Sequence, residues 1–123
     1  MSSSHTEFRT KSLEERFDIY NRIMKVHCNR IPILLYPSSR SNLPTLSNEK
    51  MLVPLEFNIG MLLANLRKDL NFNEGDSLFL YSNCDGKRSK LLKMDELVSQ
   101  LYAVDKAADG FLYLYYQDVE TMG

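Results

Sequence analysis

The sequence is poor in the residue types that mark disulfide scaffolds, metal sites and membrane spans. Two cysteines, Cys28 and Cys84, stand far apart among the 123 residues, without the density of a disulfide framework or the spacing of a metal-ligand motif. No run approaches the roughly 20 apolar residues of a membrane-spanning helix, and the first residues lack a signal-peptide core. These absences predict a domain for a reducing compartment, one that reaches a membrane only through a partner or an added lipid.

The charge of the sequence does not indicate a nucleic-acid-binding protein, and its motifs do not indicate an enzyme. The formal net charge is −1, so nothing global favours nucleic-acid binding. We find no phosphate-binding loop, metal cluster or catalytic triad, and therefore expect no enzyme, cofactor or metal. His27 and Cys28 are adjacent, and because neighbours on a helix do not face each other, they indicate a packed helix end rather than a catalytic dyad.

What the sequence does contain is a strongly apolar stretch close to its end. Residues 111–116 are all apolar or aromatic. This run predicts a strand covered on both faces, because apolar and polar residues alternate along a strand that has one face in solvent. Residues 117–123 lose this pattern and end at Gly123. They predict a flexible tail.

The amino-terminal part predicts an arm followed by a helix. Residues 1–11 are polar, and Phe8 is the residue there that could dock on a core. Ser12-Leu-Glu-Glu15 is a capping box, so we expect a helix over residues 13–28. Its predicted packed stripe is Leu13, Phe17, Tyr20, Met24 and His27, widened by Ile19, Ile23 and Val26.

The central part alternates strand and helix patterns. Residues 31–36 predict a first strand, and residues 51–54 predict a short edge strand that stops at proline. Asn58 predicts the cap of a helix to about Leu70. Residues 77–82 predict a third strand, and the apolar spacing of residues 94–102 predicts another helix. The basic run at 87–90 indicates a solvated loop, with acidic lipid headgroups as the alternative contact.

This order of elements predicts an α+β fold, the ubiquitin-like β-grasp, with a four-stranded mixed sheet and an amino-terminal helical extension. The domain should cover residues 12–116, between an arm at 1–11 and a tail at 117–123. The first and last strands should lie side by side in parallel at the centre of the sheet.

Several short motifs are spread over residues 13–123. They are Leu13-Glu-Glu-Arg16, Asn29-Arg-Ile-Pro-Ile33, Leu43-Pro-Thr-Leu46, Lys50-Met-Leu-Val-Pro54, Arg67-Lys68, Asp109-Gly-Phe-Leu-Tyr113 and Met122-Gly123. With one insertion near 84–93, these motifs resemble those of the autophagy ubiquitin-like modifiers, the family of microtubule-associated protein light chain 3 and the GABA-receptor-associated protein.

The resemblance implies a tag joined to phosphatidylethanolamine through Gly123 by E1-like and E2-like enzymes. It also implies a cysteine protease for processing or delipidation, and a protein found in the cytoplasm and, when lipidated, on the autophagosome membrane. Glycine suits this chemistry because a residue without Cβ leaves its carboxyl carbon open to attack. Two acyl chains also anchor far better than one. Two alternatives stay open: conjugation to a protein, and an adaptor that is never conjugated.

The resemblance also implies a site for Trp/Phe/Tyr-x-x-Leu/Ile/Val peptides of cargo receptors, bound as an added strand. The residues that match its aromatic pocket are Ile23, Pro32, Lys50, Leu52 and Phe111. Those that match its aliphatic pocket are Met51, Val53, Pro54, Leu62 and Leu66, with Arg67 at the rim. Ile19, Met51, Asn65 and Asp69 depart from the family pattern, which leaves peptide preference open.

Overall fold

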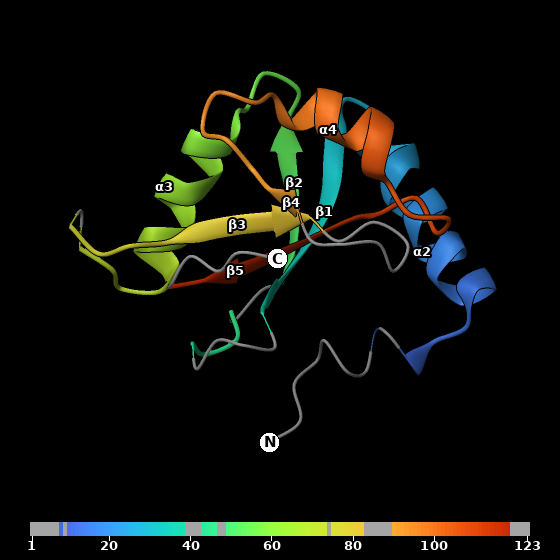
Figure 1. Ribbon diagram of the computed structural model, residues 1–123. Coiled ribbons are helices and arrows are strands. Elements are labelled where there is room, and N and C mark those ends of the chain that lie inside the picture. The colour runs from blue at the N-terminus through green and yellow to red at the C-terminus, as the bar shows by residue number, and fades with distance from the viewer. Residues whose placement is uncertain are drawn as a thin grey trace.

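The computed structural model describes residues 8, 10–38, 43–46, 49–73, 75–82 and 90–118. Figure 1 shows one curved sheet with the helices packed around it. In chain order the elements are helix α2 (Leu13–Val26), strands β1 (Arg30–Pro37) and β2 (Lys50–Pro54), helix α3 (Ile59–Asp69), strands β3 (Phe79–Ser82) and β4 (Lys90–Leu91), helix α4 (Val98–Asp105) and strand β5 (Leu112–Gln117). The ubiquitin-like order of elements is confirmed.

The sheet has the strand order β2-β1-β5-β3-β4. Strands β1 and β5 are parallel at its centre, and β2 is an antiparallel edge strand, as predicted. The predicted count of four strands is wrong, because β4 pairs with β3 and makes a fifth. Strand β4 is two residues long, too short to show a period in the sequence, so its pairing with Tyr81 and Ser82 is visible only in the fold.

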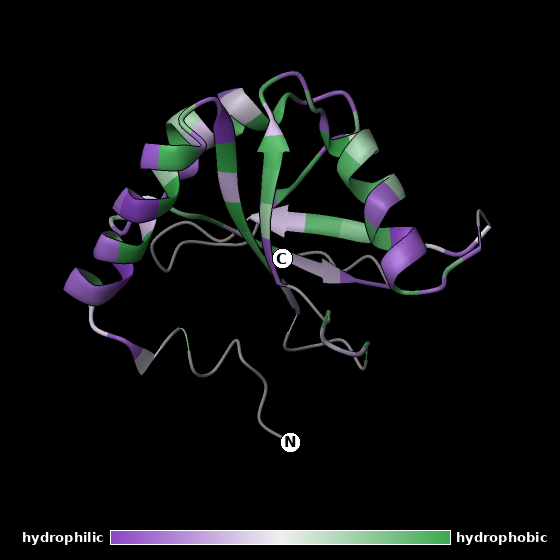
Figure 2. Cartoon of the chain, turned by 180° about the vertical axis from the view of Figure 1, so that it is seen from behind, coloured by the Kyte–Doolittle hydropathy of each residue, from purple (hydrophilic) through white to green (hydrophobic). Residues whose placement is uncertain are grey.

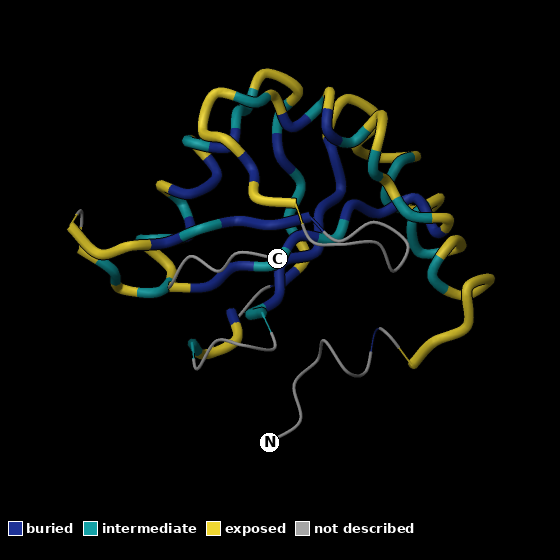
Figure 3. The backbone as a smooth tube through the Cα atoms, viewed as in Figure 1, coloured by how far each residue is buried: buried dark blue, intermediate teal, exposed yellow. Residues whose placement is uncertain are grey.

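Successive residues of the central strands point to opposite faces of the sheet, and both faces are covered. Ile33 and Leu114 belong to the large core, which also contains residues of α3 and α4. In Figure 3 the central strands are mostly dark blue, the colour of buried residues. Leu34 and Tyr36 face α2 and form a second buried cluster with Phe111. The prediction of a last strand covered on both faces is therefore confirmed.

Helix α2 begins as predicted but packs along a different stripe. Ser12 and Glu15 form the capping box, with backbone-to-side-chain distances of 3.0 and 3.1 Å. The helix ends at Val26 instead of Cys28. Leu13, Phe17 and Val26 are exposed, whereas the side turned inward carries Arg16, Ile19, Tyr20, Ile23 and Met24. The predicted stripe is rotated, and α2 shows alternating hydrophilic and hydrophobic bands in Figure 2.

Helix α3 follows its prediction, whereas α4 starts later than expected. The Asn58 side chain accepts a hydrogen bond from Met61 N–H at 2.8 Å and caps α3. Helix α4 begins at Val98. Met94 and Leu97, which were predicted to belong to its apolar face, precede it and are exposed. Leu97 instead forms an isolated antiparallel bridge with Asn58. The segment before α4 therefore pairs with the residue that caps α3.

Candidate functional site

Strand β2 is the outermost strand at its end of the described sheet, and part of its backbone faces outward. The Leu35 N–H donates to the Glu49 carbonyl at 2.9 Å, within the register that pairs β1 with β2. Hydrogen-bonded pairs recur at every second residue of an antiparallel ladder, so Met51 bonds toward β1. By the same alternation, Lys50 and Leu52 turn their N–H and C=O groups to the open edge. This edge has the donors and acceptors that an added strand needs.

The register also explains why a proline lies inside β1. Pro32 is opposite Leu52, a pair that exchanges no hydrogen bonds with β2. On its other side, pairing with β5 starts only at Ile33. The missing N–H of proline therefore costs the ladder no bond.

The residues predicted to line the aromatic pocket all come to the face of the sheet that α2 covers. Phe111 is 1% exposed and Ile23 packs against the same cluster. Since Met51 and Val53 pack with the opposite core, the alternating Lys50 and Leu52 face α2. The full set is Ile23, Pro32, Lys50, Leu52 and Phe111.

Phe8 completes this cluster and was not among the predicted site residues. Its ring is 4% exposed and meets the Phe111 ring edge-to-face at 5.3 Å between centroids. The Lys50 ammonium nitrogen lies 5.1 Å from the Phe8 centroid, within the range of a cation–π contact. The sequence signal was its position as the lone phenylalanine in an otherwise largely polar arm. Phe111 is covered by this ring and is not a surface wall.

The residues predicted to line the aliphatic pocket lie mostly on the α3 face. Val53, Leu62 and Leu66 are almost fully buried in the large core, and Met51 packs against it while partly exposed. Pro54 is the partly exposed last residue of β2. The structure brings β2 and α3 together here, with Met51 as the member at the surface between them.

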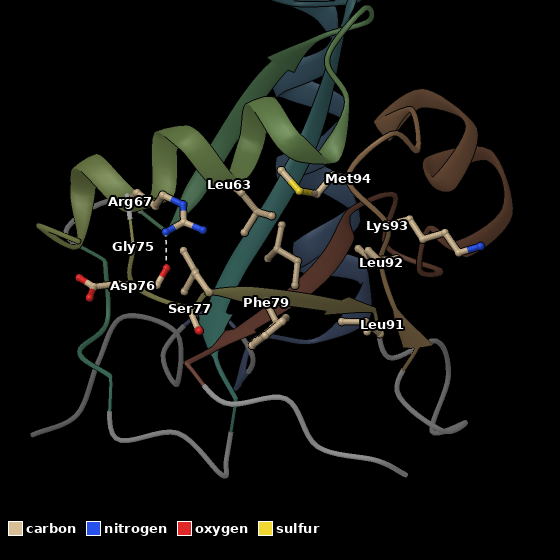
Figure 4. A pocket seen from close by; sticks show the side chains of 12 residues that line it. Leu63, Arg67, Gly75, Asp76, Ser77, Phe79, Leu91, Leu92, Lys93 and Met94 are labelled. Atoms are coloured by element: carbon tan, nitrogen blue, oxygen red, sulfur yellow. Dashed lines mark hydrogen bonds between the residues drawn. The ribbon is translucent and has the colours of Figure 1, made fainter. Parts of the chain in front are cut away.

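Arg67 is directed away from β2, toward the loop that follows α3. Its guanidinium Nη1 donates to the carbonyl oxygens of Asn73, at 3.3 Å, and of Asp76. Figure 4 shows it at one end of an open pocket of about 630 Å³ between α3, β3 and β4, where Leu63 and Met94 supply apolar walls. The predicted rim residue thus holds a loop in place.

A buried carboxylate joins α2 to the start of β5, and sequence reasoning missed it. Asp109 has a side chain that is 0% exposed and accepts from Arg16 Nη1 at 3.0 Å. It also accepts from Phe111 N–H at 3.0 Å and from the Tyr113 hydroxyl. Burial, and then the hydrogen bond to Asp109, raise the pKa of Tyr113. In the sequence, Asp109-Gly110 indicated only a turn.

Some predicted residues fall outside the part of the chain that the structure describes. These are Gly123, Cys84 and residues 87–89. Cys28 is an exposed free cysteine, and His27 is the C-cap of α2. Among the described residues, no three His, Cys, Asp or Glu side chains gather into a potential metal site. None of the described helices has the length and apolarity to cross a membrane.

Comparison with known proteins agrees with this architecture. The family model "Autophagy protein Atg8 ubiquitin like" matches residues 15–123. The chain is 34% identical over 113 residues to autophagy-related protein 8D of Oryza sativa subsp. japonica, covering 91% of this chain and 92% of the relative. It is 29% identical over 112 residues to autophagy-related protein 8 of Dictyostelium discoideum, covering 90% and 88%. The crystal structure of Trypanosoma brucei ATG8 superposes with a TM-score of 0.83 at 26% identity, covering 100% of both chains.

The family model spans most of the chain, and the fold and the sequence identities agree with it. The chain therefore belongs to the Atg8 family of autophagy ubiquitin-like proteins, which are modifiers and not enzymes.

Proposed function

We propose that this protein is an autophagy modifier with two working parts. Its β2 edge binds Trp/Phe/Tyr-x-x-Leu/Ile/Val peptides of cargo receptors, and Gly123 is conjugated to phosphatidylethanolamine. The modified protein moves from the cytoplasm to the autophagosome membrane. The observation that carries the peptide-binding part is an open strand edge whose successive side chains face opposite sides of the sheet. Met51 packs against the large core, and Leu52, which is opposite Pro32, lies on the face that α2 covers.

The geometry of this edge supports peptide binding. A peptide strand laid beside β2 exchanges backbone hydrogen bonds with Lys50 and Leu52, and its successive side chains point to opposite faces of the sheet. The aromatic residue enters between β2 and Phe111, and the aliphatic residue lies near Met51. Arg67 bonds the loop carbonyls on the side away from β2, so it would have to leave them to meet acidic residues flanking the peptide.

A titration with a synthetic Trp-x-x-Leu peptide tests this site. The double substitution Lys50→Ala and Leu52→Ala should weaken binding by about 1–3 kcal/mol, as expected for residues that line the pocket. The other edge of the sheet offers a matched control, because β4 also carries an exposed lysine and leucine, Lys90 and Leu91. Lys90→Ala with Leu91→Ala should leave the affinity unchanged. Equal losses in both double variants would place the peptide elsewhere.

Conjugation is tested by reconstitution. The protein is incubated with the E1-like and E2-like enzymes, ATP and liposomes containing phosphatidylethanolamine. We expect a lipid adduct in the mass spectrum of the wild type and none for Gly123→Ala. A protein-sized mass increase would instead indicate conjugation to a protein. An unmodified wild type, in a mixture that lipidates another family member, would contradict the lipid proposal.

A further inference from the structure

The ring of Phe8 lies where the proposed peptide needs to place its own aromatic side chain. It contacts Phe111 and Lys50, two of the residues that would wall the aromatic pocket. Close-packed interiors leave no room for a second ring at the same position. An incoming peptide therefore has to displace Phe8 or leave its aromatic residue outside.

We propose that Phe8 is an internal competitor that closes the aromatic pocket in the free protein and is expelled when a peptide binds. This inference rests on the proposed peptide-binding function and adds its regulation. Phe8 is separated from α2 by a short segment, in which Lys11 N–H donates to the Phe8 carbonyl at 3.1 Å. The ring is therefore tethered close to the pocket by a few residues, and its effective concentration there is high.

The segment around Phe8 imitates only half of the peptide. Three residues after Phe8 the chain has Lys11, an exposed cation, where a peptide motif has Leu, Ile or Val. The turn between Lys11 and Phe8 also differs from the extended backbone of an added strand. Phe8 thus fills one pocket, whereas a peptide that fills both and bonds along β2 gains enough to displace it.

The chemistry of the cluster suits a phenylalanine. The α2 side chains that pack against this cluster include the apolar Ile19 and Ile23, and Phe8 has no polar side-chain atom to satisfy. The Lys50 ammonium group lies over the face of the Phe8 ring and would lie equally well over a ring supplied by a peptide. The internal ring and the external ring therefore compete for the same contacts.

A competitor of this kind lowers affinity by the fraction of time that the pocket is open. Burial of a phenylalanine side chain is favourable enough that the closed form should dominate, even after the cost of ordering the arm. We expect Phe8→Ala to tighten binding of the Trp-x-x-Leu peptide on the order of tenfold. Phe8→Leu, which keeps part of the apolar contact, should give an intermediate gain. Thermal unfolding of each variant establishes that it is folded.

Phe17 provides the matched control. It is also a phenylalanine on the amino-terminal side, but its ring is 43% exposed. Phe17→Ala should leave peptide affinity within about twofold of the wild type. A tenfold gain in both variants would mean that general loosening of α2, and not release of Phe8, opens the site, and would overturn the proposal.

Fluorine NMR follows Phe8 directly. The protein is labelled with 4-fluorophenylalanine at its six phenylalanines, and the Phe8 signal is the one that Phe8→Leu removes. On titration with the peptide, that signal should move to the position of a solvent-exposed ring. Peptide binding with an unchanged Phe8 signal, or with unchanged affinity in Phe8→Ala, would overturn the competitor while the peptide site stands. If the peptide binds neither wild type nor Phe8→Ala, the peptide site itself fails and the competitor fails with it.

Discussion

The substitution Asp109→Asn tests whether one buried carboxylate fixes α2 to the ubiquitin-like domain. The carboxylate receives hydrogen bonds from Arg16, from the Phe111 backbone and from the Tyr113 hydroxyl. Asparagine keeps the shape and one carbonyl oxygen. It removes the negative charge and places an amide group in the network where a carboxylate oxygen had accepted hydrogen bonds.

The expected loss follows from the burial of the two partners. Removing one member of a buried ion pair costs about 3–5 kcal/mol, because the other charge is left without compensation. The Arg16 side chain is 23% exposed, so water relieves part of this cost. Its Nε is buried with no acceptor among the described residues, so the guanidinium depends strongly on Asp109. We expect Asp109→Asn to lower the free energy of unfolding by about 3 kcal/mol, and the melting temperature by roughly 10 °C.

Urea denaturation followed by far-UV circular dichroism measures this loss. Asp105→Asn is the control for a looser pair, because Asp105, whose side chain is 12% exposed, meets Lys90 at 3.7 Å and the lysine side chain is 55% exposed. Its other printed partner is the Ser82 hydroxyl, which donates at 3.3 Å and can donate equally to the asparagine carbonyl oxygen. Asp105→Asn should cost less than about 1 kcal/mol. In the double variant with Arg16→Met, the loss should be smaller than the sum of the single losses. A loss below 1 kcal/mol for Asp109→Asn, or strict additivity in the double variant, would mean that this carboxylate does not fix α2 to the domain.

Two further predictions concern the backbone and pH. Gly110 has φ of 92°, and a Cβ there would lie 2.5 Å from the Tyr20 ring. Gly110→Ala should therefore cost about 2 kcal/mol or more in urea denaturation, whereas Gly75→Ala, which meets nothing within 4 Å, should be nearly neutral. Burial raises the pKa of Tyr116 to about 12 from 10.0. The folded state thus holds this proton more tightly, so the contribution of Tyr116 to stability should be constant below pH 10.0 and be lost toward about pH 12. Tyr116→Phe should reduce that loss, and an unchanged loss would exclude Tyr116 as its source.

The parts of the fold that the sequence predicts best are those with local patterns. The capping box at Ser12, the Asn58 cap and the continuous apolar runs of the central strands each have a short-range physical cause. Strand β4 has no such cause, since its pairing depends on β3. Met94 and Leu97 kept the spacing of a helix but lie in the segment before α4.

The candidate site was predictable where it follows from strand alternation. Lys50 and Leu52 on one face and Met51 and Val53 on the other are fixed by the period of β2 and by its place at the edge. The contacts of Phe8 depend on how the arm folds back onto the domain, and the arm has no periodic sequence pattern from which these contacts could be predicted.

The docking of α2 depends on a contact that no local pattern contains. Asp109 meets Arg16 across 93 residues of sequence. The rotation of α2 has the same origin, because Arg16 belongs to the packed side through its bonds to Asp109 and to the Tyr113 hydroxyl.

Residue-specific amide hydrogen exchange tests most directly whether peptides join β2 as an added strand. Saturation with the Trp-x-x-Leu peptide should slow exchange at Lys50 and Leu52, whose N–H groups face the open edge. Met51 is an internal control, because its N–H bonds toward β1 and should change little. Slowed exchange confined to Lys50 and Leu52 is the predicted result. Binding of the peptide with no change at these two amides would contradict the account.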